Sequence, residues 1–367
     1  MGSMDLPVPF PLKPMLAKAN DGIPTGDWVF EPKWDGFRCL VFRDGDEIQL
    51  GSRNERPLTR YFPELLDPLR AALPDRCIVD GEIVVAVGDR LDFDALGQRI
   101  HPAESRVNML AEQTPAAFVA FDLVALGDDA LLERPFTERR ALLEGAVVSG
   151  GQVHLTPITT DPDVAADWFR RVEGAGLDGL IAKDPASTYQ PDKRILRKVK
   201  HQRTADCVAA GFRWHKDGKG VGSILLGIHA GHGDDPGELR HVGVSASFTA
   251  KRRAELVDEL APLVIDLDSD EFADHPWSSW YEAEAHESGQ MPGAPNRWNS
   301  QRDQSWVPLR TERVVEVGYT IMTAGRFRGT TRFVRWRPDK EPHQCTFDQL
   351  DVVPPMAFAD VLVPPDA

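Results

Sequence analysis

The sequence has few cysteines and no arrangement that would join them. Its four cysteines lie far apart, without a C-x-x-C pair or the spacing of a metal site: Cys39, Cys77, Cys207 and Cys345. Disulfide frameworks and zinc sites usually show such close spacings. We therefore expect neither, and predict reduced core cysteines of the kind found in cytosolic proteins.

Long apolar runs and an excess of basic charge are also missing. No run approaches the roughly 20 residues that span a bilayer, and the N-terminus has no signal-peptide core, so we expect a cytoplasmic protein without a membrane partner. The formal net charge is −15, from 42 Lys and Arg against 57 Asp and Glu. This excludes a surface that binds polyanions everywhere, and any nucleic-acid site must be a local basic patch.

A chain of 367 residues is long for one core, so two domains are expected. Apolar runs predict mixed strands and helices in the first half, an α+β arrangement of antiparallel sheets with packed helices. The expected strands are 28–30, 39–42, 48–50, 77–85, 118–124, 177–183 and 193–203, and the expected helices are 61–72, 93–100, 135–146 and 162–175. We place this domain at 4–203.

The second half is dominated by strands. They are expected at 205–213, 222–230, 239–248, 312–322 and 331–337, with a helix at 250–263. Five strands with a helix between the third and fourth are typical of the oligonucleotide-binding (OB) barrel. We place this domain at 204–350, with an insertion at about 265–305 that Trp277, Trp280 and Trp298 could help to order, and a C-terminal tail at 351–367.

The stretch 31–38, EPKWDGFR, lies between two apolar runs and carries Lys33, Asp35 and Gly36. Apolar neighbours that partly desolvate an ammonium favour its neutral form, which can attack an electrophile. Gly36 would allow close approach of the backbone to a ligand. The alternative is that Lys33 and Asp35 are ordinary loop charges.

Other charges interrupt apolar strands. Asp80 and Glu82 lie within the strand 77–85, where carboxylates are costly unless a metal, a ribose hydroxyl or an internal Arg or Lys meets them. A structural salt bridge is the simpler alternative. Arg53 is either a solvated loop charge or a donor to phosphate. Phe121 is either core or a surface on which a base stacks.

Two basic stretches suggest phosphate binding. Residues 193–203 hold six Lys or Arg, and Lys198 and Lys200 alternate with Val199, so both ammonium groups share one face of a strand. A solvated basic edge strand is the alternative. Arg335 and Arg337 share a face of the last strand in the same way, with a solvated barrel rim as the alternative. Arg99, which follows a short helix, is expected to point at solvent or phosphate.

Seven motifs occur in a fixed order: EPKWDGFR (31–38), SRN (52–54), VDGEIV (79–84), FVAFDL (118–123), LDGLIAK (177–183), LRKVK (196–200) and RFVRWRPDK (332–340). Together they resemble the covalent nucleotidyltransferases, which comprise ATP-dependent DNA ligases, RNA ligases and mRNA-capping enzymes. The resemblance is strongest to compact bacterial ATP-dependent DNA ligases of the C type and to the ligase domain of bacterial ligase D. It spans about residues 10 to 350.

The resemblance implies that Lys33 attacks the α-phosphorus of ATP, holds AMP, and passes it to the 5′-phosphate of a nick that a 3′-hydroxyl then seals. By the same resemblance, the catalytic residues are Lys33, Lys198, Lys200, Asp339 and Lys340. The implied nucleotide-binding residues also include Glu31 and Pro32, Arg38 and Glu82 near the ribose, Arg53 at a phosphate, Phe121 under the base, and Lys183 and Arg335. Glu82 and Asp178 are the implied ligands of Mg²⁺, with Mn²⁺ as an alternative.

The implied partner is nicked duplex DNA, with a DNA-repair polymerase or nuclease as a further partner, and a monomer is expected. A hinge is implied near 201–205. Two alternatives stay open: RNA ligation or guanylyl transfer by the same chemistry, and a catalytically silent scaffold that binds nucleic acid. Glu31 favours adenine over guanine, and the intact Lys33, Glu82 and Lys198/Lys200 set disfavours a silent scaffold.

Overall fold

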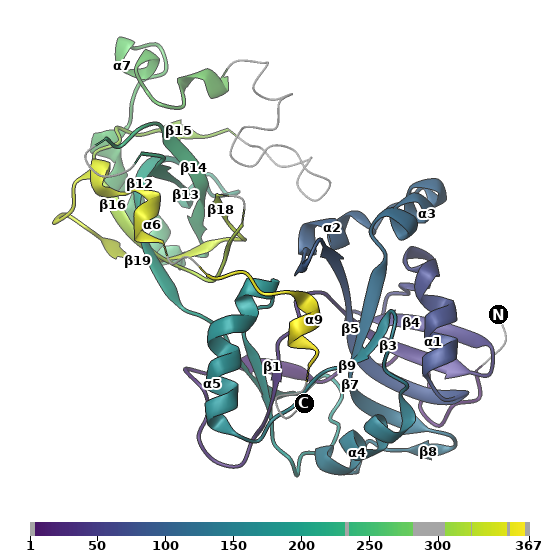
Figure 1. Cartoon of the computed structure of the whole chain (residues 1–367). Helices are drawn as coiled ribbons and strands as arrows, with labels where there is room; N and C mark the ends of the chain where they lie inside the picture. Colours follow the sequence, from purple (N-terminus) through teal and green to yellow (C-terminus); the bar gives the residue numbers. More distant parts are fainter. Residues whose placement is uncertain (1–3, 232–234, 282–304, 324, 351–352, 364–367) are drawn as a thin grey trace. The chain divides into compact units, whose positions relative to one another are not determined.

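The computed structural model describes residues 4–231, 235–281, 305–323, 325–350 and 353–363. It divides into two compact units (Figure 1): the chain up to Lys200 together with the residues from Val353 onward, and His201–Val352. The sequence placed this boundary three residues later, and treated 351–367 as a separate tail. In the structure the described part of that tail packs in the first unit.

The first unit contains two sheets. The smaller has the order β1-β11-β10-β2 and the larger the order β4-β3-β5-β7-β8, with β6 on β5 and β9 on β7. The strands of the smaller sheet are β1 (Leu16–Ala19), β2 (Val29–Pro32), β10 (Leu180–Lys183) and β11 (Arg194–Val199). Those of the larger are β3 (Phe37–Asp44), β4 (Glu47–Ser52), β5 (Arg76–Val87), β6 (Arg90–Leu91), β7 (Ala116–Leu126), β8 (Asp129–Ala130) and β9 (Val153–Leu155).

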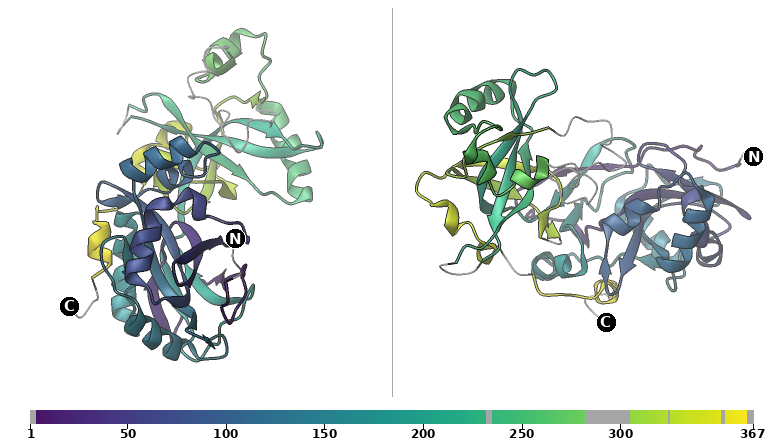
Figure 2. Two further views of the ribbon diagram at one scale, coloured as in Figure 1. Left: turned by 90° about the vertical axis from the view of Figure 1, so that its right-hand side faces the viewer. Right: turned by 90° about the horizontal axis from the view of Figure 1, so that it is seen from above.

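Helices lie on the outside of these sheets (Figure 2). They are α1 (Leu66–Ala72), α2 (Phe93–Gln98), α3 (Glu104–Gln113), α4 (Phe136–Ala146), α5 (Pro162–Arg171) and α9 (Phe358–Val361), with short 3₁₀ turns η1 (Thr59–Tyr61), η2 (Pro63–Leu65) and η3 (Val172–Ala175). The sequence marks several of their ends. Asp161 caps the N-terminus of α5 by accepting from the Asp163 N–H, and Gly176, in the left-handed region, ends η3.

Apolar strands hold the first unit together. The central strands β5 and β7 are buried along most of their length, because one face packs against the helices and the other against the smaller sheet. One cluster of buried residues joins the two sheets and includes Met15, Leu40, Phe42, Ile78 and Leu196. The pocket described below lies beside this cluster.

The second unit is built on a ring of strands. β12 (Arg203–Trp214), β13 (Val221–His229), β14 (Leu239–Ala246), β19 (Thr331–Trp336) and β16 (Val314–Tyr319) pair in that order, and β16 pairs again with β12. All these pairs are antiparallel except β14 with β19. Such closure is the arrangement of an OB barrel, and its strands agree with the predicted ranges.

Smaller elements surround the ring. The strands are β15 (Val307–Pro308), β17 (Met322–Thr323) and β18 (Arg326–Phe327); the helices are α6 (Ala250–Leu260) and α7 (Asp270–Ala273); and the 3₁₀ turns are η4 (Ala261–Leu263), η5 (Ser278–Tyr281), η6 (Pro342–Gln344) and η7 (Phe347–Gln349). Helix α6 falls between the third and fourth of the five predicted strands, as expected. In the predicted insertion, Trp277 is buried and stacks on Trp280 with ring centroids 4.5 Å apart. Residues 282–304, including Trp298, lie outside the described residues.

Arg99 differs from the prediction. Its side chain is fully buried rather than directed at solvent or phosphate, and it pairs with both carboxylate oxygens of Glu64 at 2.6 and 2.9 Å. A guanidinium directly after a short helix can be buried when a carboxylate lies beside it to form an ion pair. The four cysteines are free and buried, as predicted. No helix in the described part of the chain is both long and apolar enough to cross a membrane.

Candidate active site

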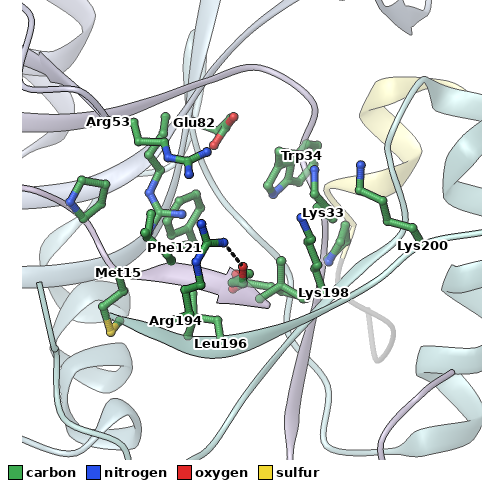
Figure 3. A pocket seen from close by; sticks show the side chains of 17 residues that line it. Met15, Lys33, Trp34, Arg53, Glu82, Phe121, Arg194, Leu196, Lys198 and Lys200 are labelled. Carbon is green, nitrogen blue, oxygen red and sulfur yellow. Dashed lines mark hydrogen bonds between the residues drawn. The ribbon is translucent and has the colours of Figure 1, made fainter. Parts of the chain in front are cut away.

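A pocket in the first unit gathers most of the residues that the motifs single out (Figure 3). It lies between the smaller sheet and strands β3, β5 and β7. Its lining comprises Pro14, Met15, Leu16, Ala17, Glu31, Pro32, Lys33, Trp34, Arg38, Arg53, Glu82, Phe121, Ile181, Arg194, Leu196, Lys198 and Lys200. Motifs separated by more than 160 residues thus meet in one place.

Strand register explains one wall. Ile181 on β10 is opposite Glu31 on β2 and opposite Lys198 on β11, so these three side chains form a row on one face of the smaller sheet. On the larger sheet, Arg38 on β3 is opposite Glu82 on β5. Strand pairing therefore places Glu31, Lys198, Arg38 and Glu82, whereas Lys33, Arg53 and Lys200 lie just beyond the ends of strands.

Lys33 is held at the end of the first wall. Its backbone N–H donates to the Gly179 carbonyl at 2.8 Å, and its carbonyl accepts from the Asp178 N–H at 3.1 Å. Gly179 has φ +114°, and a β-carbon on it would lie 2.1 Å from the Val199 carbonyl oxygen. Only glycine fits that close approach of strands, which fixes the position of Lys33 relative to Asp178.

The Lys33 ammonium is paired with a carboxylate. Its Nζ lies 2.8 Å from an Asp178 oxygen, and the Lys200 ammonium contacts the same carboxylate. Burial acts to raise the pKa of Asp178, but the two lysines outweigh it and hold that pKa below its usual value. The Lys33 side chain is 20% exposed, so it can be reached from the pocket. Its nearest charged partner is therefore the acid Asp178.

Lys198 completes a group of three ammonium ions at this end. Partial burial lowers its pKa, and the neighbouring charges of Lys200 and Lys33 lower it further. Three cations with a single shared carboxylate leave net positive charge facing the pocket. That charge suits a polyphosphate.

The two carboxylates of the third motif have different surroundings. Asp80 is fully buried and receives two bonds from Arg38, each 2.6 Å long, and one from the Tyr189 hydroxyl at 2.6 Å. Glu82 faces the pocket instead, and burial raises its pKa to about 7 while Arg38 and Lys33 act in the opposite direction. Asp80 is therefore the residue in a structural salt bridge, whereas Glu82 lines the pocket.

Glu31 and Lys183 form a buried pair below the pocket. Their Oε2 and Nζ atoms are 3.0 Å apart, and both side chains are less than 5% exposed. Lys183 also donates to the Phe121 carbonyl at 2.9 Å and lies 4.9 Å from the centroid of the Phe121 ring. Lys183 is not among the lining residues but contacts Glu31 and Phe121, and its contact with phosphate stays a prediction.

Among the other lining residues, some were predicted and one was not. Phe121 lines the pocket, and the Arg38 guanidinium lies 4.3 Å from its ring centroid. Arg53 and Pro32 line it as predicted. Arg194, which the sequence did not single out, also lines it and donates to the Ala17 carbonyl at 3.4 Å (Figure 3). Its place in the basic run at 193–203 was the available signal.

The C-terminal motif lies in the second unit. Arg337 and Lys340 both bind the Asp206 carboxylate, at 3.0 and 2.8 Å, and Arg337 also pairs with Asp339 at 2.8 Å. Arg335, more than half exposed, pairs with Glu316 on β16 at 2.6 Å. Asp206 was not predicted, and nothing in its sequence surroundings marks it as the residue that organises this motif.

Comparison with known proteins identifies this arrangement. Residues 14–200 match the ATP dependent DNA ligase domain, and residues 217–340 match the ATP dependent DNA ligase C terminal region. The fold and the lysine pocket are thus those of an ATP-using nucleotidyltransferase. The chain belongs to the ATP-dependent DNA ligases, the enzymes that seal nicks in DNA with ATP.

Its relatives include proteins similar over their whole length. The chain is 54% identical to DNA ligase C of Mycobacterium tuberculosis, over 98% of this chain and 99% of the relative. It is 56% identical to DNA ligase C2 of Mycolicibacterium smegmatis, over 96% and 97%. A solved structure of a Lig E DNA ligase covers 89% of this chain and 99% of its own with a TM-score of 0.53 and 17% identity, a likeness of fold.

Proposed function

We propose that this ligase works through a covalent AMP on Lys33 and seals 3′-hydroxyl/5′-phosphate nicks in duplex DNA, in DNA repair. The observation that carries the proposal is the position of the Lys33 amine. It is partly exposed at a pocket that also presents Glu31, Phe121, Lys198 and Lys200. The pocket thereby combines a nucleophile, an aromatic surface the size of a base, and cations suited to phosphate.

The first chemical step follows from these contacts. Lys33 is paired with Asp178 and reacts as the neutral amine, so its proton passes to solvent before the attack. Its lone pair then forms a bond to the α-phosphorus of ATP, the bond to the bridging oxygen breaks, and pyrophosphate leaves with the electron pair. Lys198, Lys200 and Arg53 stabilise the charge that spreads over the phosphate oxygens.

Roles for the remaining site residues are part of this proposal. Glu31 reads the adenine edge, Phe121 supports the base, and Glu82 with Arg38 lies at the ribose. Arg335, Asp339 and Lys340 act on ATP from the second unit. The AMP then passes to the 5′-phosphate of the nick, and the 3′-hydroxyl displaces it. A monomer in the cytoplasm, with nicked DNA and a repair polymerase or nuclease as partners, completes the proposal.

A magnesium ion fits the carboxylates that are present. No group of three or more His, Cys, Asp or Glu that could hold a metal occurs among the described residues. Mg²⁺ nevertheless binds readily through one or two carboxylates together with phosphates and water. Glu82 and Asp178 would supply those carboxylates, and Mn²⁺ would suit the same oxygen ligands. When bound, the ion would neutralise charge on the phosphates.

Labelling experiments test the nucleotide and the nucleic acid. Incubation with [α-³²P]ATP is expected to label the protein, whereas [α-³²P]GTP is not, because Glu31 is assigned to adenine. A chase with nicked duplex DNA should release the label and join the strand more efficiently than nicked duplex RNA. Labelling by GTP alone would point to guanylyl transfer, and release only by RNA would make the protein an RNA ligase.

The pH dependence of adenylation should report on Glu82. Burial raises its pKa to about 7, so the charged form is lost as the pH falls through 7. A carboxylate that must be charged for ribose or metal binding would be about ten-fold less populated at pH 6 than at pH 8. We expect single-turnover adenylation of the native enzyme to fall by roughly that factor.

The variant Glu82→Gln provides the comparison. It should adenylate more slowly at every pH, and its rate should lose the acid limb near pH 7 while any dependence due to other groups persists. If the Gln variant kept the same limb, a different group would be titrating.

A further inference from the structure

The described C-terminal residues, 353–363, pack in the first unit, although the chain reaches them only after the whole of the second. We call them the C-terminal segment; it includes α9, shown in Figure 1. The segment contributes to an apolar cluster that also contains Trp34 and Phe121, two lining residues of the pocket. Its contributions are Met356, Phe358, Val361 and Leu362.

Phe358 makes the most direct connection to the site. Its ring meets Trp34 edge-on, with centroids 5.8 Å apart and an interplanar angle of 82°. Trp34 is 4% exposed, and its Nε1–H donates to the buried Thr156 hydroxyl at 2.8 Å. The indole is therefore fixed by an apolar contact and by a hydrogen bond, and it directly follows Lys33 in the chain.

Two further contacts fix the position of the C-terminal segment on the first unit. The Phe358 N–H donates to the Asp89 carbonyl at 2.6 Å. The chain before it passes over Gly174, where a β-carbon would lie 2.1 Å from the Pro354 carbonyl oxygen. A side chain at Gly174 would force the C-terminal segment away from its position. Gly174 lies on η3 and is not among the residues that line the pocket.

We propose that Phe358 is a positioning residue for the transfer of AMP to Lys33, acting through Trp34. The proposal builds on the assigned role of Lys33 as nucleophile. Phosphoryl transfer depends on the reacting atoms being held in place, and a misplacement of about 1 Å can cost about 100-fold in rate. Without the Phe358 ring, Trp34 loses its edge-on aromatic contact, and the adjoining Lys33 is held less firmly.

The variant Phe358→Ala tests this in the full-length enzyme. We expect single-turnover adenylation by ATP to slow about ten-fold or more. Sealing of a nick that already carries AMP on its 5′-phosphate should be unchanged, because Lys33 makes no bond in that step. Phe358→Tyr keeps the ring and should restore adenylation. Asp360→Ala, an exposed change on the same helix, is the matched control and should behave like the native enzyme.

A second variant and a double-substitution cycle keep the test independent of folding. Gly174→Ala leaves the ring in the chain but displaces the segment, and should slow adenylation in the same selective way. In a Trp34→Leu background, Phe358→Ala should cost much less than it does alone, because residues that act through each other are not additive.

Three outcomes would overturn the proposal: unchanged adenylation in Phe358→Ala, an equal loss in adenylation and in sealing of the adenylated nick, or additive effects in the cycle. Absence of any adduct on the native enzyme would instead refute the role of Lys33 itself, which separates the two ideas.

Discussion

Lys33→Ala is expected to abolish transfer of AMP from ATP to the protein. The Lys33 amine is the proposed nucleophile, whereas Lys198 on β11 and Lys200 just after it are assigned to the phosphates and are not expected to replace it. Lys33→Arg should fail equally, since a guanidinium stays protonated and is a poor nucleophile. Gel detection of the labelled adduct measures both.

The same variants should retain part of the last step. Sealing of a pre-adenylated nick uses the 3′-hydroxyl of DNA as nucleophile, so Lys33→Ala should still join that substrate. Lys251→Ala removes an amine that is 88% exposed on α6 and serves as the control with full activity. A labelled adduct on the Lys33→Ala protein would contradict the assignment and place the nucleophile elsewhere.

Arg139→Ala is expected to cause a large loss of stability in the first unit. Arg139 is fully buried, and its guanidinium donates twice to the buried Asp122, at 2.8 and 3.0 Å, and also to the carbonyls of Arg134 and Ser187. Removal leaves an uncompensated buried carboxylate, which typically costs about 3–5 kcal/mol. Domains are stable by only about 5–15 kcal/mol, so a marked fall in the denaturant midpoint should follow.

The control lies in the same helical region. Arg134 forms an exposed pair with Glu138 at 3.2 Å, and Arg134→Ala should change the free energy of unfolding by no more than about 1 kcal/mol. A double variant, Asp122→Leu with Arg139→Met, replaces both charges and should be less destabilised than Arg139→Ala. Equal losses in the single and double variants would show that packing, rather than the stranded charge, sets the cost.

The order of motifs and the strand pattern were enough to predict much of this molecule. Apolar runs predicted the strands of both units because buried strands consist largely of apolar residues. The turn at Gly45 was predicted from its position between two such runs. Lys198 and Lys200 both line the pocket, although β11 ends at Val199 and only Lys198 lies on the strand. Family resemblance then gave the activity, which the comparisons confirm.

Partners of charged side chains could not be predicted in the same way. Asp80 and Glu82 lie on the same strand, two residues apart, yet Asp80 is paired with Arg38 and accepts a hydrogen bond from Tyr189 while Glu82 faces the pocket. Arg99 has the sequence surroundings of a surface residue but is buried against Glu64. The local pattern of apolar and polar residues predicts which strands are buried. It does not predict which charged residue, distant in the sequence, lies next to a given side chain.

By itself, the sequence determined the family and the two kinds of domain, because these depend on residue types at short spacings and on local periodicity, and it predicts Lys33 as the nucleophile. Tertiary structure decided that Lys33 is paired with Asp178, that Lys183 supports Glu31 and Phe121, and that the C-terminal segment packs beneath Trp34. These contacts join residues from 62 to more than 300 positions apart. They depend on strand register and on the close packing of whole elements, neither of which a short stretch of sequence encodes.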